Sequence, residues 1–202
     1  AILADIASNN LTLTDQAITV NSGVDVSVAN AKSLAADTSG TVTATITSTE
    51  RVSSLVELRQ PDGSNNEENA FTIAIHSNDA TASTAANLNT INAATSVAVN
   101  INAVTALAAS DLADLTTLNT NIAGFSNTGN IAAITLTNDG GGGDGNVDFG
   151  TLETIIDNYK ARKATVSFTL QAGDTIDVDT TDELSAILAD IASNNLTLTD
   201  QA

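Results

Sequence analysis

The sequence predicts an α/β protein, built as an elongated, solenoid-like stack of short β-α-β units in a tandem array. Two observations lead to this expectation. Short β-branched segments alternate with Ala- and Leu-rich segments of helical period, an order typical of parallel strands joined by helices. In addition, the segment AILADIASNNLTLTDQA occurs twice without a single difference, at 1–17 and at 186–202. Tandem β-sandwich domains are the alternative, because the strands are short and helices rich in Ala and Thr are easily assigned in error.

Strands are expected where β-branched residues alternate with other residues. They are LTLT and AITV between residues 11 and 20, then residues 41–47, 70–76, 96–100, 131–137, 164–170 and 175–178. Helices are expected where apolar residues recur every three or four positions. They cover residues 28–37, 50–59, 83–94, 101–122 with a break near Ser110, 151–163 and 181–193.

The last of these helices has the clearest boundaries. Thr180 and Glu183 have the spacing of a capping box, and Asn194 with Asn195 ends the helical pattern. Four apolar residues at positions i, i+3, i+4 and i+7 form one face of the helix. They are Leu184, Ile187, Leu188 and Ile191. We expect this face to be the repeat junction, where one repeat buries apolar surface against the next.

The exact recurrence predicts a tandem repeat in which Ala186 is equivalent to Ala1. The first copy lacks the helix start that precedes the second copy, so we interpret the chain as a window of a longer array. Residues 1–185 are then one full repeat, and 186–202 begin the next. An artificially duplicated end is the alternative. A weaker internal half-repeat, 24–37 against 97–110, suggests that one strand-helix unit recurs within the period.

The charge of the chain excludes several partners. The chain contains six basic and 24 acidic residues, so its formal net charge is -18. This negative charge opposes binding to nucleic acid or to an anionic membrane. No segment has the roughly 20 apolar residues of a membrane span, so we expect no membrane insertion. The acidic, hydrated composition without cysteine is typical of bacterial extracellular proteins. We therefore expect an extracellular or cell-surface location.

An acidic, glycine-rich loop at 138–150 suggests a calcium site. Part of it matches the second half of an EF-hand loop, although glycines stand at the first two ligand positions and Thr151 at the last. A looser cage of oxygen ligands is the remaining form of such a site. Its candidate ligands are Asp139, Asp144, Asn146, Asp148 and Glu153. A solvated acidic loop is the alternative, and the surrounding carboxylates argue against a dinucleotide site.

A basic cluster ends the helix expected at 151–163. It contains Tyr159, Lys160, Arg162 and Lys163. Cations at a helix C-terminus complement the helix dipole without any partner. In a strongly acidic rod, however, this cluster is a candidate contact with the next repeat or with a neighbouring fibre.

The sequence does not predict an enzyme. It contains one histidine, His76, no cysteine and no GxSxG nucleophile motif. No combination of nucleophile, base and oxyanion donors is recognisable.

The long exact repeat, the acidic composition, the absence of cysteine and phrases such as LAADTSGTVTATI resemble the giant tandem-repeat surface and fibre proteins of bacteria, including those of cyanobacteria. This resemblance implies an exported adhesin, surface-layer component or fibre, frequently stiffened by calcium. We therefore expect a structural repeat of a very long secreted protein that forms an extracellular filament or cell-surface fibre, with other copies of itself as partners. The alternatives are a ligand-binding adhesin module, with a cell-surface glycan as partner, and a surface-layer component.

Overall fold

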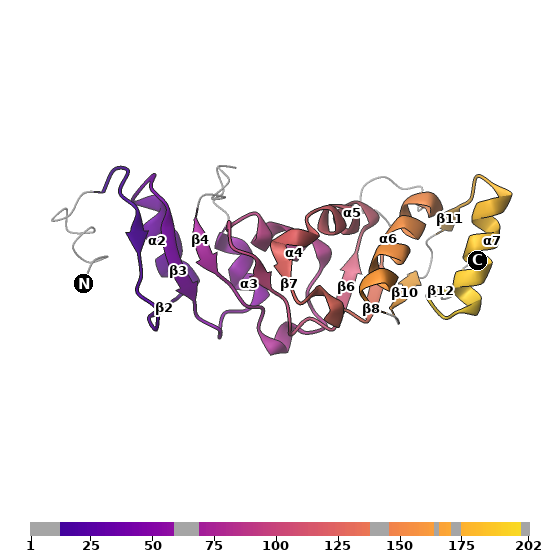
Figure 1. Ribbon diagram of the computed structural model, residues 1–202, viewed down its shortest axis with the longest axis horizontal. Helices are drawn as coiled ribbons and strands as arrows, with labels where there is room; N and C mark the ends of the chain where they lie inside the picture. The colour runs from indigo at the N-terminus through magenta and orange to yellow at the C-terminus, as the bar shows by residue number, and fades with distance from the viewer. Residues whose placement is uncertain (1–12, 59–68, 138–145, 164–165, 171–174, 199–202) are drawn as a thin grey trace. The chain divides into compact units, whose positions relative to one another are not determined.

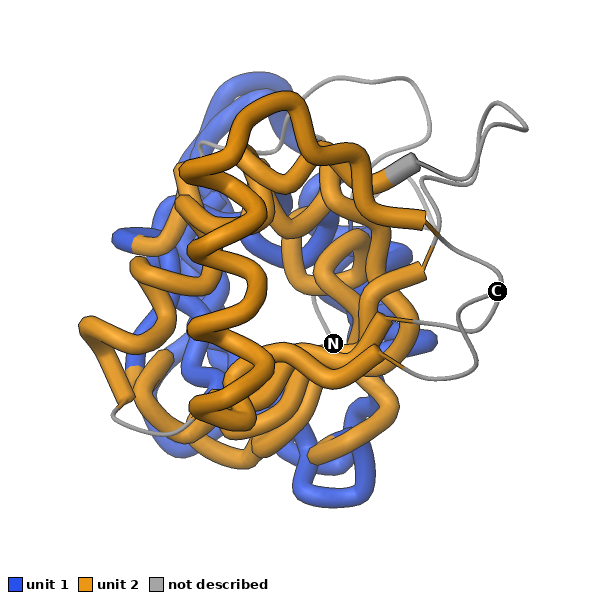
Figure 2. The backbone as a smooth tube through the Cα atoms, turned by 90° about the vertical axis from the view of Figure 1, so that its right-hand side faces the viewer, with its two compact units in different colours: residues 1–79, 90–101, 123–126 blue, residues 80–89, 102–122, 127–202 orange. Residues whose placement is uncertain are grey.

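The computed structural model describes residues 13–58, 69–137, 146–163, 166–170 and 175–198. The chain divides into two compact units, which are described separately here (Figure 2). The first unit contains residues 1–79, 90–101 and 123–126. The second unit contains residues 80–89, 102–122 and 127–202.

The first unit is built on short parallel strands. Strand β3 (Val42–Ile46) pairs with β1 (Ile18–Thr19) and β2 (Asp25–Val26), and with β4 (Ala70–Thr72). A second parallel pair joins β5 (Val99–Asn100) to β7 (Phe125–Ser126). The helical segments between the strands are α2 (Val28–Ala36), α3 (Val52–Leu55), η1 (Val56–Leu58) and η3 (Ser77–Asp79). The boundary between the two units falls within α4 (Ala85–Asn92).

The second unit contains a parallel sheet of four strands in the order β12-β10-β8-β6. These strands are β6 (Ala106–Ser110), β8 (Ala133–Leu136), β10 (Ser167–Leu170) and β12 (Leu196–Leu198). A separate parallel pair joins β9 (Asn146–Asp148) to β11 (Thr175–Asp177). The helical segments are α5 (Leu112–Thr120), η4 (Ile122–Gly124), which crosses the unit boundary, η5 (Thr128–Asn130), α6 (Phe149–Arg162) and α7 (Thr181–Ala192) (Figure 1).

All strand pairs among the described residues are parallel, and in the four-stranded sheet each strand pairs with strands of the neighbouring chain segments. Parallel neighbours require a crossover, and α6 and α7 lie in two of these crossovers. This confirms the expected α/β class. The alternative of β-sandwich domains is wrong for the described residues, because sandwiches are made of antiparallel strands.

Each unit buries its few aromatic side chains in an aliphatic core. In the first unit, Phe71 lies in a core with aliphatic side chains such as Val42 and Leu55, all at most 1% exposed. In the second unit, Phe149, Tyr159 and Phe168 are at most 1% exposed. All four Phe residues and the one Tyr are buried, so every aromatic side chain of the chain packs in a core.

The expected helix at 101–122 is partly wrong, and so is the helical part of the internal half-repeat. Residues 28–36 form α2, but the aligned residues 101–109 end in strand β6. The Ala-rich sequence ALAAS favours a helix locally, yet pairing with β8 buries Leu107 and Ser110 to 1% and 3% exposure. Tertiary contacts therefore override helix propensity at this position. The segments 24–37 and 97–110 do not share one strand-helix structure.

Candidate functional site

The C-terminal part of the second unit exposes an apolar helix face. The predicted capping box is confirmed at the start of α7, where Thr180 accepts from the Glu183 amide and Glu183 accepts from the Thr180 amide. The helix ends at Ala192, and Asn194 follows with a left-handed φ of 57°. The boundaries of α7 were thus predicted to within one residue.

The four predicted junction residues divide between two sides of α7. Ile187 is buried at 7% exposure and packs into the second unit. Leu184, Leu188 and Ile191 are 50%, 59% and 37% exposed. Strand β12 follows directly, and among the described strands its only partner is β10. Its last residue, Leu198, is 40% exposed. We call this surface, formed by Leu184, Leu188, Ile191, Leu198 and the outer edge of β12, the α7–β12 end.

A charged cluster joins the inner side of α7 to α6, which lies beside it (Figure 1). The Lys160 Nζ atom lies 3.3 Å from Oδ1 of Asp190 and 3.6 Å from Oδ1 of Asp157. The Asp190 side chain is only 5% exposed, and its Oδ1 also accepts a hydrogen bond from Asn195. Burial lowers the pKa of Lys160, but the two carboxylates raise it overall. The ammonium group therefore stays charged and compensates the buried Asp190.

Glu153 completes this cluster as a second carboxyl group beside Asp190. Burial and the neighbouring carboxylates of Asp190 and Asp157 raise the pKa of Glu153 to about 7, although Lys160 opposes the shift. Neither Oε2 of Glu153 nor Oδ2 of Asp190 has a partner when both groups are taken as acceptors, as ionised carboxylates are. A proton held by Glu153 supplies the missing donor. The two carboxyl groups then share a hydrogen bond instead of repelling each other.

The other members of the predicted basic cluster contact elements of the same unit. The Tyr159 ring packs edge-on against Phe168 with 6.1 Å between centroids, and burial raises the pKa of Tyr159 to about 12. The Arg162 guanidinium lies 5.3 Å from the Tyr159 ring centroid and donates to Oδ1 of Asn119 in α5. Lys163 donates to the Asn130 carbonyl in η5. The end of α6 thus binds α5, η5 and α7.

The first copy of the repeated segment contributes a different set of contacts, within the first unit. The Thr14 carbonyl accepts hydrogen bonds from the amide and the hydroxyl of Ser39, both at 3.0 Å. The Gln16 carbonyl accepts from the Thr38 hydroxyl at 2.7 Å. Gly40 permits this close approach, because a Cβ atom there would lie 2.5 Å from the Gln16 carbonyl carbon and oxygen. Residues 14–16 therefore pack against the chain that follows α2.

The structure does not bring the candidate calcium ligands together among the residues it describes. Asp139 and Asp144 lie outside the described residues, and so does the Asn146 side chain. Asp148 caps α6 instead, and hydrogen bonds from the Thr151 hydroxyl and amide lower the pKa of Asp148. Glu153 faces Asp190. No group of three or more Asp, Glu, His or Cys side chains in the described ranges is arranged to hold a metal ion.

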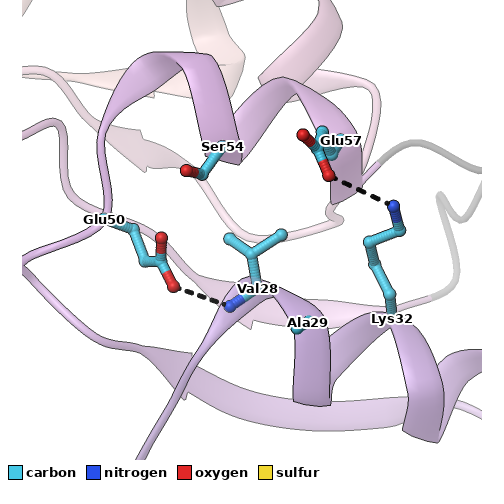
Figure 3. Close-up of a pocket in the computed structure, with 6 residues that line it drawn as sticks. All are labelled: Val28, Ala29, Lys32, Glu50, Ser54 and Glu57. Atoms are coloured by element: carbon cyan, nitrogen blue, oxygen red, sulfur yellow. Dashed lines mark hydrogen bonds and ion pairs between the residues drawn. The ribbon is translucent and has the colours of Figure 1, made fainter.

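An open groove of about 420 Å³ lies between α2 and α3 of the first unit (Figure 3). Its charged groups have structural partners: Glu50 accepts from the Val28 amide at the start of α2, and Lys32 pairs with Glu57 at 3.5 Å. The groove therefore has no convergent set of unpaired reactive groups. It is lined by Val28, Ala29, Lys32, Glu50, Ser54 and Glu57.

His76 also has a structural contact. Its Nδ1 accepts a hydrogen bond from the Asn78 amide. Nearby, Asp79 receives two hydrogen bonds from Arg51 and a third from the Val52 amide, which lower the pKa of Asp79. This group holds the start of α3 to η3.

Sequence reasoning missed the two ion pairs that hold a buried carboxylate, Arg51 with Asp79 and Lys160 with Asp190. Their partners are 28 and 30 residues apart, so no local spacing indicates them. One signal was available for Asp190. It follows the buried Ile187 by three residues, so a carboxylate on the inner face of an amphipathic helix required a cation nearby.

Comparisons with protein-family models, with curated proteins and with solved structures found no match to this chain. Within the described parts of the chain, no helix has both the length and the apolar character needed to cross a membrane.

Proposed function

We propose that this chain is a structural repeat of a very long secreted bacterial protein that forms an extracellular filament or cell-surface fibre. In this proposal the strand-helix units stack into an elongated, solenoid-like array in which residues 1–185 are one period. The function is mechanical: each repeat holds the next at a fixed distance. Adhesion through the exposed surface of such a fibre is compatible with this role.

The distribution of exposed apolar side chains is the observation that carries the proposal. Among the described residues, the large apolar side chains that remain exposed are Leu184, Leu188, Ile191, Leu198 and Val24, the last 56% exposed. The first four lie around the second copy of the repeated segment. Val24 lies shortly after Ala17, the end of the first copy. In an array, all five therefore fall at one junction, where the next repeat buries them.

The contacts described for the two copies of the repeated segment are compatible with the same junction, because they involve positions of the segment that do not overlap. In the second copy, Asp190 contacts Lys160, the Asn195 carbonyl accepts from the Phe168 amide, and β12 pairs with β10. These positions correspond to 5, 10 and 11–13 of the repeat. In the first copy, positions 14 and 16 contact the chain that follows α2. A single segment in an array can make both sets of contacts at once.

The pattern of strand pairing also supports continuation of the stack. In the second unit, β6, β8, β10 and β12 pair in chain order, each joined to the next by a crossover. The outer edge of β12 offers the same parallel pairing to one further strand. A strand of the following repeat would pair in parallel with β12 and extend the sheet in the same order along the chain.

The charge suits a long, hydrated extracellular rod. Counting Asp190 and Asp200 of the second copy only once changes the net charge from -18 to -16 for one period. Such rods repel one another laterally and stay soluble, and the apolar contacts are confined to the junctions.

Electron microscopy of the native, multi-repeat material tests this function. We expect regular fibres with an axial repeat that corresponds to one period, and we expect this repeat to persist across fibres of different length. Adding a calcium chelator tests the remaining calcium hypothesis, since loosened fibres would indicate a cation in the acidic loop. Isolated particles without an axial repeat would contradict the structural role and favour the adhesin module.

A further inference from the structure

We propose that the side chains of Lys160 and Asp190 react to form an amide bond that cross-links α6 to α7, with Glu153 as the catalytic acid of this reaction. The chain is then its own substrate, and Lys160 and Asp190 are sites of covalent modification. The geometry and burial of the charged cluster between the two helices carry this inference. A covalent link suits a mechanical role, but the inference does not depend on how repeats are arranged.

The two reacting groups are in contact. The Lys160 Nζ atom lies 3.3 Å from Oδ1 of Asp190, and this oxygen is bonded to Cγ, the carbon that the amine attacks. Holding a nucleophile beside its target replaces an encounter in solution by a step within one molecule. The Asp190 side chain is only 5% exposed, so little water reaches the amide product to hydrolyse it.

The two oxygens of Asp190 have the different environments that amide formation requires. Oδ1 accepts a hydrogen bond from the Asn195 side-chain amide at 3.2 Å, which stabilises negative charge on this oxygen during the attack. Oδ2 is buried, and within the described chain its donor is the proton of Glu153. Burial and the carboxylates of Asp190 and Asp157 raise the pKa of Glu153 to about 7, so Glu153 still carries a proton near neutral pH. Oδ2 is therefore the oxygen that can leave as water.

The reaction balances within the cluster. One proton moves from the Lys160 ammonium to the carboxyl pair, so that the amine is neutral and both Asp190 and Glu153 are protonated. The amine attacks Cγ, the C–N bond forms, and negative charge develops on Oδ1. Glu153 protonates Oδ2, the Cγ–Oδ2 bond breaks and water leaves, and Glu153 then recovers a proton from the nitrogen. One ammonium and one carboxylate thus become one amide and one water, without any other reactant.

The charge state of Lys160 sets the speed of this reaction. Burial lowers the pKa of Lys160, but the carboxylates of Asp190 and Asp157 raise it overall, so the neutral amine is a minor form. The bond therefore forms slowly after folding. It accumulates because the product is buried and its hydrolysis needs water.

Mass spectrometry of the unfolded chain, after it has first been kept folded, tests the proposal. The chain should weigh less than its sequence by the mass of one water molecule. Trypsin should release residues 60–162 and 164–202 as one branched peptide, because an acylated lysine at 160 is not cleaved. Fragmentation of this peptide should locate the bond between Lys160 and Asp190.

Two variants test the roles of the residues, each with a matched control. Lys160→Arg should keep the full mass of its sequence, whereas Lys163→Arg, the same change at a lysine that donates to the Asn130 carbonyl, should lose water. Glu153→Gln should slow the loss of water at least about 100-fold, the usual effect of removing a general acid. Glu57→Gln makes the same change at an exposed side chain of the first unit and should react at the unchanged rate. The reacted fraction is followed from newly synthesised chains, and amide hydrogen exchange of α6 shows that each variant is folded.

Three outcomes would contradict the proposal. A folded chain that keeps its full mass at neutral and at mildly alkaline pH would leave Lys160 and Asp190 as an ion pair only. Loss of water that persists in Lys160→Arg would place the dehydration at another residue, such as a succinimide at an Asp-Gly sequence. Equal rates for Glu153→Gln and the unchanged chain would overturn the role of Glu153 as the acid.

Discussion

The two copies of the repeated segment have the same sequence but differ in burial at the one position that the structure describes in both. Leu13 and Leu198 are the same repeat position, and it is the one position described in both copies. Leu13 is half-buried, whereas Leu198 is 40% exposed. After the first copy, the chain continues into β1, α2 and β3, and the described residues include no such segment after the second copy. In the proposed array, burial at this position would depend on the repeat that follows it.

The largest effect should come from testing α7 in both environments. Leu188→Asp in the last α7 of a chain should change the free energy of unfolding by less than about 0.5 kcal/mol, because the side chain is already 59% exposed. The same substitution in the internal α7 of a two-period chain should cost about 3 kcal/mol, because it buries a charge at the junction. Urea unfolding of each pair measures the difference. An equal change in the free energy of unfolding at both positions would contradict burial of the internal α7 by the next repeat.

The second-largest effect should come from the contacts between the first copy and the chain that follows α2. Gly40→Ala places a Cβ atom 2.5 Å from the Gln16 main chain, so residues 14–16 must move away. We expect the free energy of unfolding to fall by about 2 kcal/mol. Hydrogen exchange of the Ser39 amide, which donates to the Thr14 carbonyl, should become faster. Gly129→Ala is the control, since its nearest neighbour would lie at 3.5 Å, an ordinary contact. Unchanged exchange at Ser39 would contradict the assigned contact.

A smaller effect should link the charged cluster behind α7 to pH. The pKa of Glu153 is about 7 in the folded chain, against 4.5 for an ordinary Glu, so the folded state binds more protons between these values. Its contribution to stability is complete below about pH 4.5 and is lost as the pH rises through 7. Because Glu153 is partly exposed, we expect the free energy of unfolding to fall by only about 1 kcal/mol as the pH rises through this range.

The measurement for this prediction is the free energy of unfolding of the chain between pH 5 and 8, compared with Glu153→Gln. The variant keeps a hydrogen-bonding amide beside Asp190 but cannot titrate, so its profile should be flatter over this range. Asp177→Asn is the control, because Asp177 is exposed and is not among the groups that shift the pKa of Glu153. A Glu153→Gln profile that is as steep as the unchanged one would place the titration elsewhere.

Helix α7 shows which structural features can be predicted from the sequence and which cannot. The limits of α7 follow from local chemistry, namely a capping box at Thr180 and an Asn that adopts a left-handed φ at 194, and local chemistry is visible in the sequence. The division of its apolar face is not visible. Periodicity places Ile187 beside Leu184 and Leu188, but only the packing of α7 against α6 and β12 decides which of these residues is buried.

The segment ALAAS shows the opposite limit. Its composition favours a helix, and its strand conformation depends on the distant strand β8, where Ile134 is the partner of Leu107. The basic cluster is a third case. Its location at the end of α6 was evident, but the partners of Lys160 and Arg162 are set by helix packing and are 30 and 43 residues away. Contacts of this separation leave no local pattern in one sequence.

The smallest effect should be found at the Lys32–Glu57 pair in the groove of the first unit. Both side chains are partly exposed, at 33% and 62%, and their separation is 3.5 Å. Water and salt screen such a pair, so Lys32→Met should change the free energy of unfolding by less than about 0.5 kcal/mol. Arg51→Met should cost more, because Asp79, whose side chain is only 7% exposed, would lose its cation. Urea unfolding of both variants measures this contrast, and similar costs would mean that the groove pair holds α2 to η1 in the way that Arg51 holds α3 to η3.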